Sequence, residues 1–155
     1  MVKGMSVAVL AVALSGAGAS SAAASDQSVR AAIRQFQPGL AQSALSLESA
    51  LVAKPSTAAY ATLDAATRRY LATLTIDHTV LAATRASTSK VASGRTLILA
   101  SLTHLSQAAS DLDRGLQAAK VHNRPAAARE LAVSEKQFHR AAADEVAAAK
   151  LIGHV

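Results

Sequence analysis

Apolar residues return every three or four positions along most of the chain beyond residue 25. A period of about 3.6 residues is that of an amphipathic α-helix, so the pattern predicts helix along most of this length. The clearest stripe consists of Ile98, Leu102, Leu105, Ala109, Leu112, Leu116 and Ala119. Its alternating steps of four and three residues are typical of helices that pack with a left-handed twist.

Three further segments carry less regular stripes. The first stripe contains Val29, Ile33, Phe36, Leu40 and Leu47. The second contains Tyr60, Leu63, Thr67, Leu71, Leu74, His78 and Leu81. The last contains Leu131, Phe138, Ala142, Val146 and Ala149. The alternation of period two that marks strands is nearly absent, which indicates an all-α protein.

Few residues interrupt helix in this alanine-rich chain, which holds 7 glycines and 3 prolines. Breakers gather at 54–56, 87–94 and 122–125 and predict turns there. The expected helices cover about 26–53, 57–87, 91–121 and 125–152, with Asp26 and either Ser56 or Thr57 as N-caps. Pro38 predicts a kink in the first helix. Short connections favour opposite directions in successive helices, so we expect one domain over 25–155, an antiparallel up-down-up-down four-helix bundle.

The first 24 residues have the features of a signal peptide. Lys3 precedes an apolar run at 7–14, and Ala22-Ala23-Ala24 supplies small residues for cleavage. We therefore expect a secreted or otherwise extracytoplasmic protein, cut after Ala24 or Ser25, with an uncleaved anchor as the alternative. No later segment is apolar enough to predict a membrane span.

Composition excludes several chemistries. The chain has no cysteine, and both methionines, Met1 and Met5, lie in the predicted signal peptide. Thiolate metal sites, iron–sulfur clusters and cysteine nucleophiles all need sulfur, so none of them is expected. No serine lies in a G-x-S-x-G motif or beside a convincing histidine and acid. We therefore expect a protein that is not an enzyme and carries no cofactor.

The formal net charge is +6, and the predicted bundle concentrates positive charge at one end. The start of the first helix, the turn between the second and third, and the end of the fourth should meet there. This predicted basic pole consists of Arg30, Arg34, Arg85, Lys90, Arg95 and Lys150, against Asp26, Asp144 and Glu145. Clustered cations attract anions, so the pole predicts binding to an anionic polymer, lipid headgroups or an acidic protein partner. Nucleic acid is not expected, because aromatic residues do not interleave with the arginines.

Two other functions stay open at the level of sequence. His78, His104 and His139, with Glu145, lie near one level of the predicted bundle, which leaves a metal- or haem-binding site as one alternative. Ile76, Val80, Leu97 and Leu99 fall outside the main stripes, which leaves a structural, self-associating bundle, such as a homodimer, as the other.

Overall fold

The structure is a computed structural model that describes residues 21–54 and 56–152. Its elements are α1 (Ser21–Leu51), α2 (Thr57–Ala82), α3 (Ser89–Lys120) and α4 (Arg124–Ile152). The prediction of an all-α protein with four helices is confirmed, since these residues contain four helices and no strand. Residues 21–24 form the first turn of α1, whereas the rest of the predicted signal peptide lies outside the described residues.

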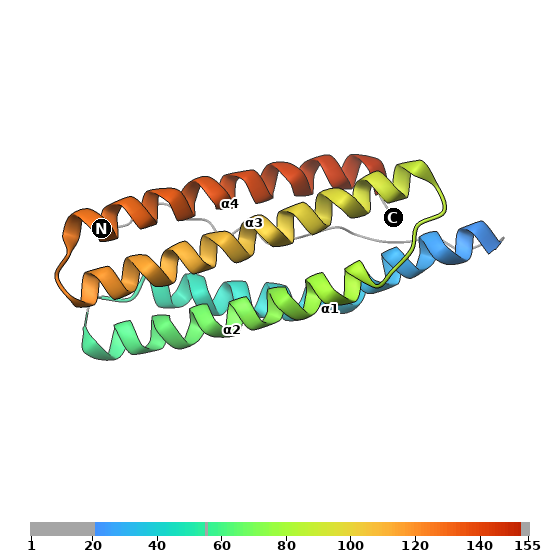
Figure 1. The fold of residues 1–155 in the computed structure, drawn as a ribbon. Coiled ribbons are helices and arrows are strands. Elements are labelled where there is room, and N and C mark those ends of the chain that lie inside the picture. Colours follow the sequence, from blue (N-terminus) through green and yellow to red (C-terminus); the bar gives the residue numbers. More distant parts are fainter. Residues whose placement is uncertain (1–20, 55, 153–155) are drawn as a thin grey trace.

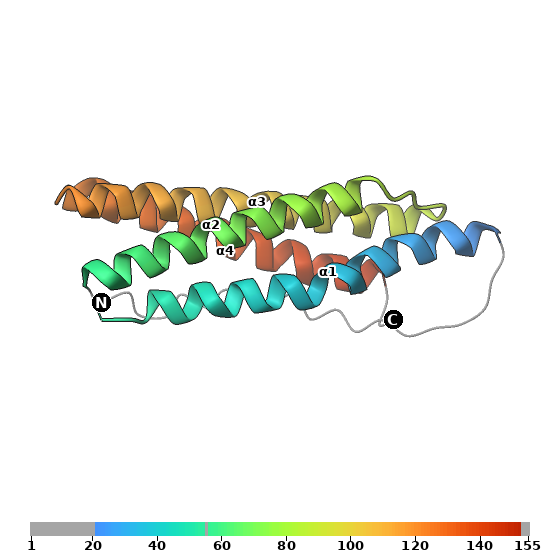
Figure 2. The same ribbon diagram turned by 90° about the horizontal axis from the view of Figure 1, so that it is seen from below.

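The helices pack as an elongated bundle in which the chain reverses direction at each short connection (Figure 1). The closest pairing is between α3 and α4, and α2 packs against both α1 and α3 (Figure 2). One end of the molecule holds the start of α1, the connection between α2 and α3, and the end of α4. The other end holds the two remaining connections. Within the described ranges, no helix is both long and apolar enough to cross a membrane.

The core follows a four-and-three spacing on every helix, but its register on two helices differs from the predicted one. On α2 the buried positions are Leu63, Thr67, Tyr70, Leu74, Asp77 and Leu81, and His78 is exposed. On α4 they include Phe138, Ala141, Glu145, Ala148 and Ile152, and Val146 is 59% exposed. Asp77 on α2 and Glu145 on α4 occupy positions in these seams that the sequence analysis gave to His78 and Val146.

Side chains define the helix ends. Ser56 caps α2 by accepting a hydrogen bond from the amide of Ala59 at 3.0 Å. Of the two predicted caps, Ser56 and Thr57, it is therefore Ser56 that caps this helix. The helix α2 ends at Ala82 rather than at about 87, and Thr88 forms the N-cap of α3. His122 has φ 57° and follows the end of α3. The amides of His122 and Asn123 bond to the carbonyls of Ala119 and Ala118, the pattern of a Schellman motif.

The prediction of Asp26 as an N-cap is wrong. The helix α1 begins at Ser21, and Asp26 lies inside it with its carboxylate turned toward the α2–α3 connection. The same helix runs without a break through Pro38. Pro38 and Gly39 are both exposed. Proline has no backbone N–H, so one carbonyl of the preceding turn lacks its helical donor, and on the solvent side water can hydrate that carbonyl.

Candidate functional site

The end of the bundle that carries the predicted basic pole is tied together by Asp26. Its carboxylate accepts hydrogen bonds from the amides of Ser87, at 2.8 Å, and Thr88, at 3.2 Å. It also accepts one from the hydroxyl of Thr88 at 2.7 Å. The start of α1 is thereby held against the residues that open α3, so segments far apart in sequence meet here.

These hydrogen bonds decide the ionisation of Asp26. Burial favours the neutral acid, but the donors from Thr88 and Ser87 outweigh burial and hold the pKa of Asp26 below its ordinary value. The carboxylate is therefore ionised at neutral pH, and hydrogen-bond donors within the bundle already engage its charge.

Two residues of the basic pole hold helix ends. Arg95 donates from Nε to the carbonyl of Leu81 at 3.1 Å and from Nη2 to that of Ala82 at 2.7 Å. Arg30 donates from Nη2 to the carbonyl of Ile152 at 3.3 Å. A cation at a helix C-terminus satisfies free carbonyls and opposes the negative end of the helix dipole. Arg30 and Arg95 therefore position this end of the bundle.

The other four residues of the pole, Arg34, Arg85, Lys90 and Lys150, are all exposed. We call them the exposed pole cations. No ion pair within 21–54 or 56–152 involves any of them. Their charges are thus available to an external anion.

The carboxylates in the same half of the bundle face inward or have partners. Asp144 lies 3.0 Å from His104 Nδ1. Glu145 and Asp77 are buried, at 9% and 5% exposure. Because Asp26, Asp77 and Glu145 are buried and Asp144 is partly covered and lies against His104, little negative charge is exposed beside the exposed pole cations.

A buried polar cluster lies in the same half and consists of Tyr70, Asp77, Ser101 and Glu145. Burial raises the pKa of Glu145 to about 7, an effect that the hydrogen bond from Ser101, at 3.0 Å, partly opposes. Burial also raises the pKa of Asp77 to about 6. Burial and the charges of Glu145 and Asp77 raise the pKa of the Tyr70 hydroxyl. The Tyr70 hydroxyl and Asp77 Oδ2 have no hydrogen-bond partner among the described residues.

Sequence reasoning did not place these four side chains together in the core, and it considered Glu145 as a candidate metal ligand. A signal was present, since Tyr70 and Asp77 continue the four-and-three spacing of Leu63, Thr67 and Leu74. Reading the register by spacing alone, without rejecting polar residues, would have placed them in the core.

The structure does not bring together the histidines of the alternative metal- or haem-binding site. His78 and His139 are exposed, and His139 lies 3.9 Å from Glu135 on its own helix. His104 pairs with Asp144, while Glu145 bonds to Ser101. In the part of the chain that the structure describes, no group of three or more histidine, cysteine or acidic side chains could hold a metal ion.

The residues considered for self-association are mostly part of the bundle. Val80, Leu97 and Leu99 are partly buried and pack against the core. Ile76 is 62% exposed. Among the four, Ile76 alone thus offers a largely exposed apolar side chain.

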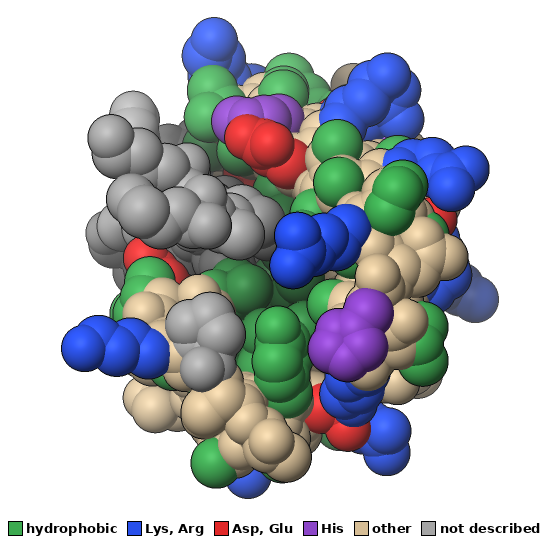
Figure 3. All heavy atoms as spheres, turned by 90° about the vertical axis from the view of Figure 1, so that its left-hand side faces the viewer, with side chains coloured by type: hydrophobic (Ala, Val, Ile, Leu, Met, Phe, Trp, Pro, Cys, Tyr) green, Lys and Arg blue, Asp and Glu red, His purple; other side chains and the backbone are tan. Residues whose placement is uncertain are grey.

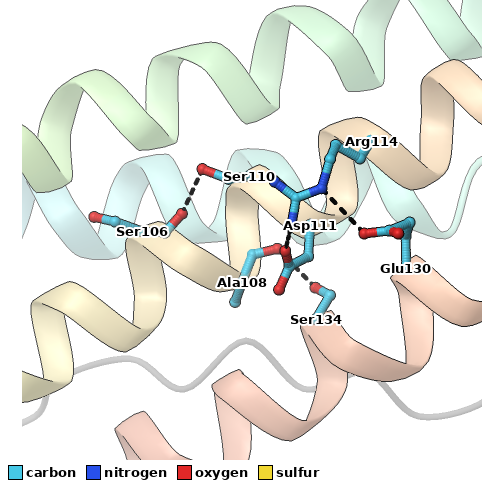
Figure 4. A network of polar contacts seen from close by, with 7 residues as sticks. All are labelled: Ser106, Ala108, Ser110, Asp111, Arg114, Glu130 and Ser134. Carbon is cyan, nitrogen blue, oxygen red and sulfur yellow. Dashed lines mark hydrogen bonds and ion pairs between the residues drawn. The ribbon is translucent and has the colours of Figure 1, made fainter.

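A second set of polar contacts joins α3 to α4 in the other half of the bundle (Figure 4). Arg114 pairs with Asp111 on its own helix and with Glu130 on α4, at 3.1 Å. Ser134 donates to the carbonyl of Ala108 at 2.8 Å. One guanidinium is shared by two carboxylates, which marks a contact between helices and leaves no unpaired cation here for an anionic ligand.

Comparisons with known proteins give no relative for this chain. No protein-family model, no curated protein and no solved structure matches it.

Proposed function

We propose that the chain is an exported, non-enzymatic antiparallel helical bundle that binds an anionic surface, an anionic polymer or an acidic protein through its basic pole. The observation that carries the proposal is the separation of charge at this end. Arg34, Arg85, Lys90 and Lys150 are exposed, whereas the nearby carboxylates are buried or paired. Such an arrangement keeps a positive potential at the surface and draws anions to it.

We assign binding to the exposed pole cations and structural support to Arg30 and Arg95. Arg30 and Arg95 occupy helix ends, so replacing them would disturb the fold as well as the charge. Within residues 21–54 and 56–152, the side chains of the exposed pole cations form no ion pair, and their replacement should leave the fold intact.

The test is a charge-reversed variant in which Arg34, Arg85, Lys90 and Lys150 are all replaced by Glu. Binding to vesicles that contain anionic lipid and to linear polyphosphate should be lost, while circular dichroism stays helical. The matched control replaces the exposed Arg69, Arg129, Lys136 and Arg140 by Glu, which changes the net charge equally but elsewhere. The control should retain most of the binding. Equal loss in both variants would show that net charge acts without the pole, and unchanged binding in both would reject an electrostatic contact.

A further inference from the structure

The end of the bundle opposite the basic pole contains an apolar hollow of about 180 Å³. All four helices contribute to its lining. Leu63, Leu112, Leu116 and Leu131 supply its larger aliphatic walls. Small residues account for the empty space, since Ala50, Ala59 and Ala119 line the hollow without filling it.

A second, more open and more polar hollow of about 520 Å³ adjoins the first. Tyr60 and Ala119 line both, so the two hollows are neighbours. The second adds Thr57, Asp64, Lys120 and His122. Figure 3 looks onto this end and shows a recess of hydrophobic side chains bordered by Lys or Arg and by His side chains.

Asp64 and Lys120 are the charged side chains that line the polar hollow, and Lys120 is the less engaged of the two. Asp64 is engaged by Arg68 of the same helix at 3.2 Å. Lys120 forms no ion pair with any residue in the described ranges. The ammonium of Lys120 and the ring of His122 are therefore the groups that a polar ligand would meet beside the apolar hollow.

We propose that these joined hollows bind a small anionic amphiphile, a carboxylate whose apolar part is about the size of a phenyl ring. The size follows from the volume, because an apolar cavity of roughly 150 Å³ stays dry and takes up benzene. The charge follows from the ammonium of Lys120, which donates to a carboxylate but repels another ammonium group. The site lies at the other end of the molecule from the basic pole, so it does not depend on the function proposed above.

The experiment is a calorimetric titration of the full chain with 3-phenylpropanoate, 3-phenylpropan-1-ol and 3-phenylpropylamine. These probes share one ring and differ in charge. The carboxylate should bind most tightly and the amine most weakly. Equal affinity for all three would overturn the assignment of an anion, and no heat from any of them at millimolar concentration would overturn the site.

Two variants locate the binding. Ala119→Leu places a larger side chain where both hollows meet and keeps a good helix former in α3, so it should abolish binding while the protein stays folded. Lys120→Gln should weaken binding of the carboxylate about threefold and leave that of the alcohol unchanged. Lys136→Gln removes an exposed lysine from α4 that lines neither hollow and should change nothing. Carboxylate binding that survives Ala119→Leu in folded protein would place the ligand elsewhere and refute the proposal.

Discussion

At the scale of single residues, the same chemical group contributes to stability with opposite dependence on pH at two places in this bundle. Asp26 gains donors that favour its charged form, whereas Glu145 is buried with one hydroxyl donor. The pKa of Asp26 lies below its ordinary value, and that of Glu145 lies at about 7, above its ordinary 4.5. Linkage converts these shifts into changes in the free energy of unfolding.

For Glu145, the folded state binds its proton more tightly than the unfolded chain does. The free energy of unfolding should therefore fall as pH rises from about 4.5 to about 7, and then level off. Glu145→Gln removes the titration and should be more stable than the parent by about 2–3 kcal/mol at pH 9, with almost no difference at pH 4. Urea unfolding of both proteins across this range measures the effect. The exposed Glu135→Gln serves as the control, and a difference for Glu145→Gln that does not vary with pH would contradict the argument.

For Asp26, the sign is reversed. Its contribution is present above the unfolded pKa, near 3.8, and is lost as pH falls through the lower folded pKa. Asp26→Asn should cost about 1–3 kcal/mol at pH 7 and much less at pH 2. Asp113→Asn provides a comparison on α3 with only a long contact to Gln117, of 3.4 Å. An Asp26→Asn variant as stable as the parent at neutral pH would mean that the bonds to Ser87 and Thr88 contribute nothing.

The cations of the pole and the buried acids show why the candidate site was only partly predictable from the sequence. The sequence predicted that Arg85 and Lys90 would lie at the same end as Arg34, because that follows from the order of turns. It did not predict that Arg30 and Arg95 would hold helix ends, because such bonds depend on the positions of carbonyls in other helices. Burial of Asp77 and Glu145 was missed because transfer costs argue against acids in a core.

At the scale of helices, two glycines with the same conformation have opposite roles. A Cβ at Gly94 of α3 would lie 2.4 Å from Ile152 Cγ1, so Gly94 permits the close approach of α3 to the end of α4. A Cβ at Gly39 of α1 would meet nothing within 4 Å. The first glycine is required by packing, and the second only reduces helix propensity.

The matched pair Gly94→Ala and Gly39→Ala tests this difference. Gly94→Ala should lower the free energy of unfolding by about 1–3 kcal/mol because Ile152 must move. Gly39→Ala should raise it by roughly 0.5–1 kcal/mol. Chemical denaturation of the two variants gives both values, and a gain from Gly94→Ala as large as that from Gly39→Ala would show that Ile152 does not restrict this position.

Helix positions were easier to predict than helix ends and registers. Spacing of apolar residues located four helices and most of the buried side chains of α1 and α3. The end of α2 was placed too late because Arg95 and Asp26, from other helices, organise the following connection through hydrogen bonds with Leu81, Thr84 and Ser87. On α4 the choice of Val146 over Glu145 followed hydrophobicity, whereas the helix buries whichever residue the four-and-three spacing of Phe138, Ala141 and Ala148 requires.

At the scale of the whole molecule, an elongated bundle places its two candidate binding regions at opposite ends. The basic pole offers exposed charge, and the other end offers an apolar hollow with a cationic edge. Arg114, Asp111 and Glu130 lie between α3 and α4, where one guanidinium is shared by two carboxylates. Salt should therefore lower the affinity of the basic pole for its ligand more than that of the apolar hollow, since screening weakens contacts between exposed charges far more than apolar burial.

Salt dependence gives a quantitative test of the pole. On a flexible polyanion, each cation that displaces a counterion contributes roughly −0.7 to the slope of log affinity against log salt concentration, so four cations should give about −3. Titration of the parent with linear polyphosphate at several salt concentrations should approach this slope. Replacing Arg34 and Lys90 alone by Gln should reduce its magnitude by about half, because each remaining cation still releases a counterion. A slope near zero in the parent, or one that the double variant leaves unchanged, would show that the exposed pole cations do not contact the polyanion.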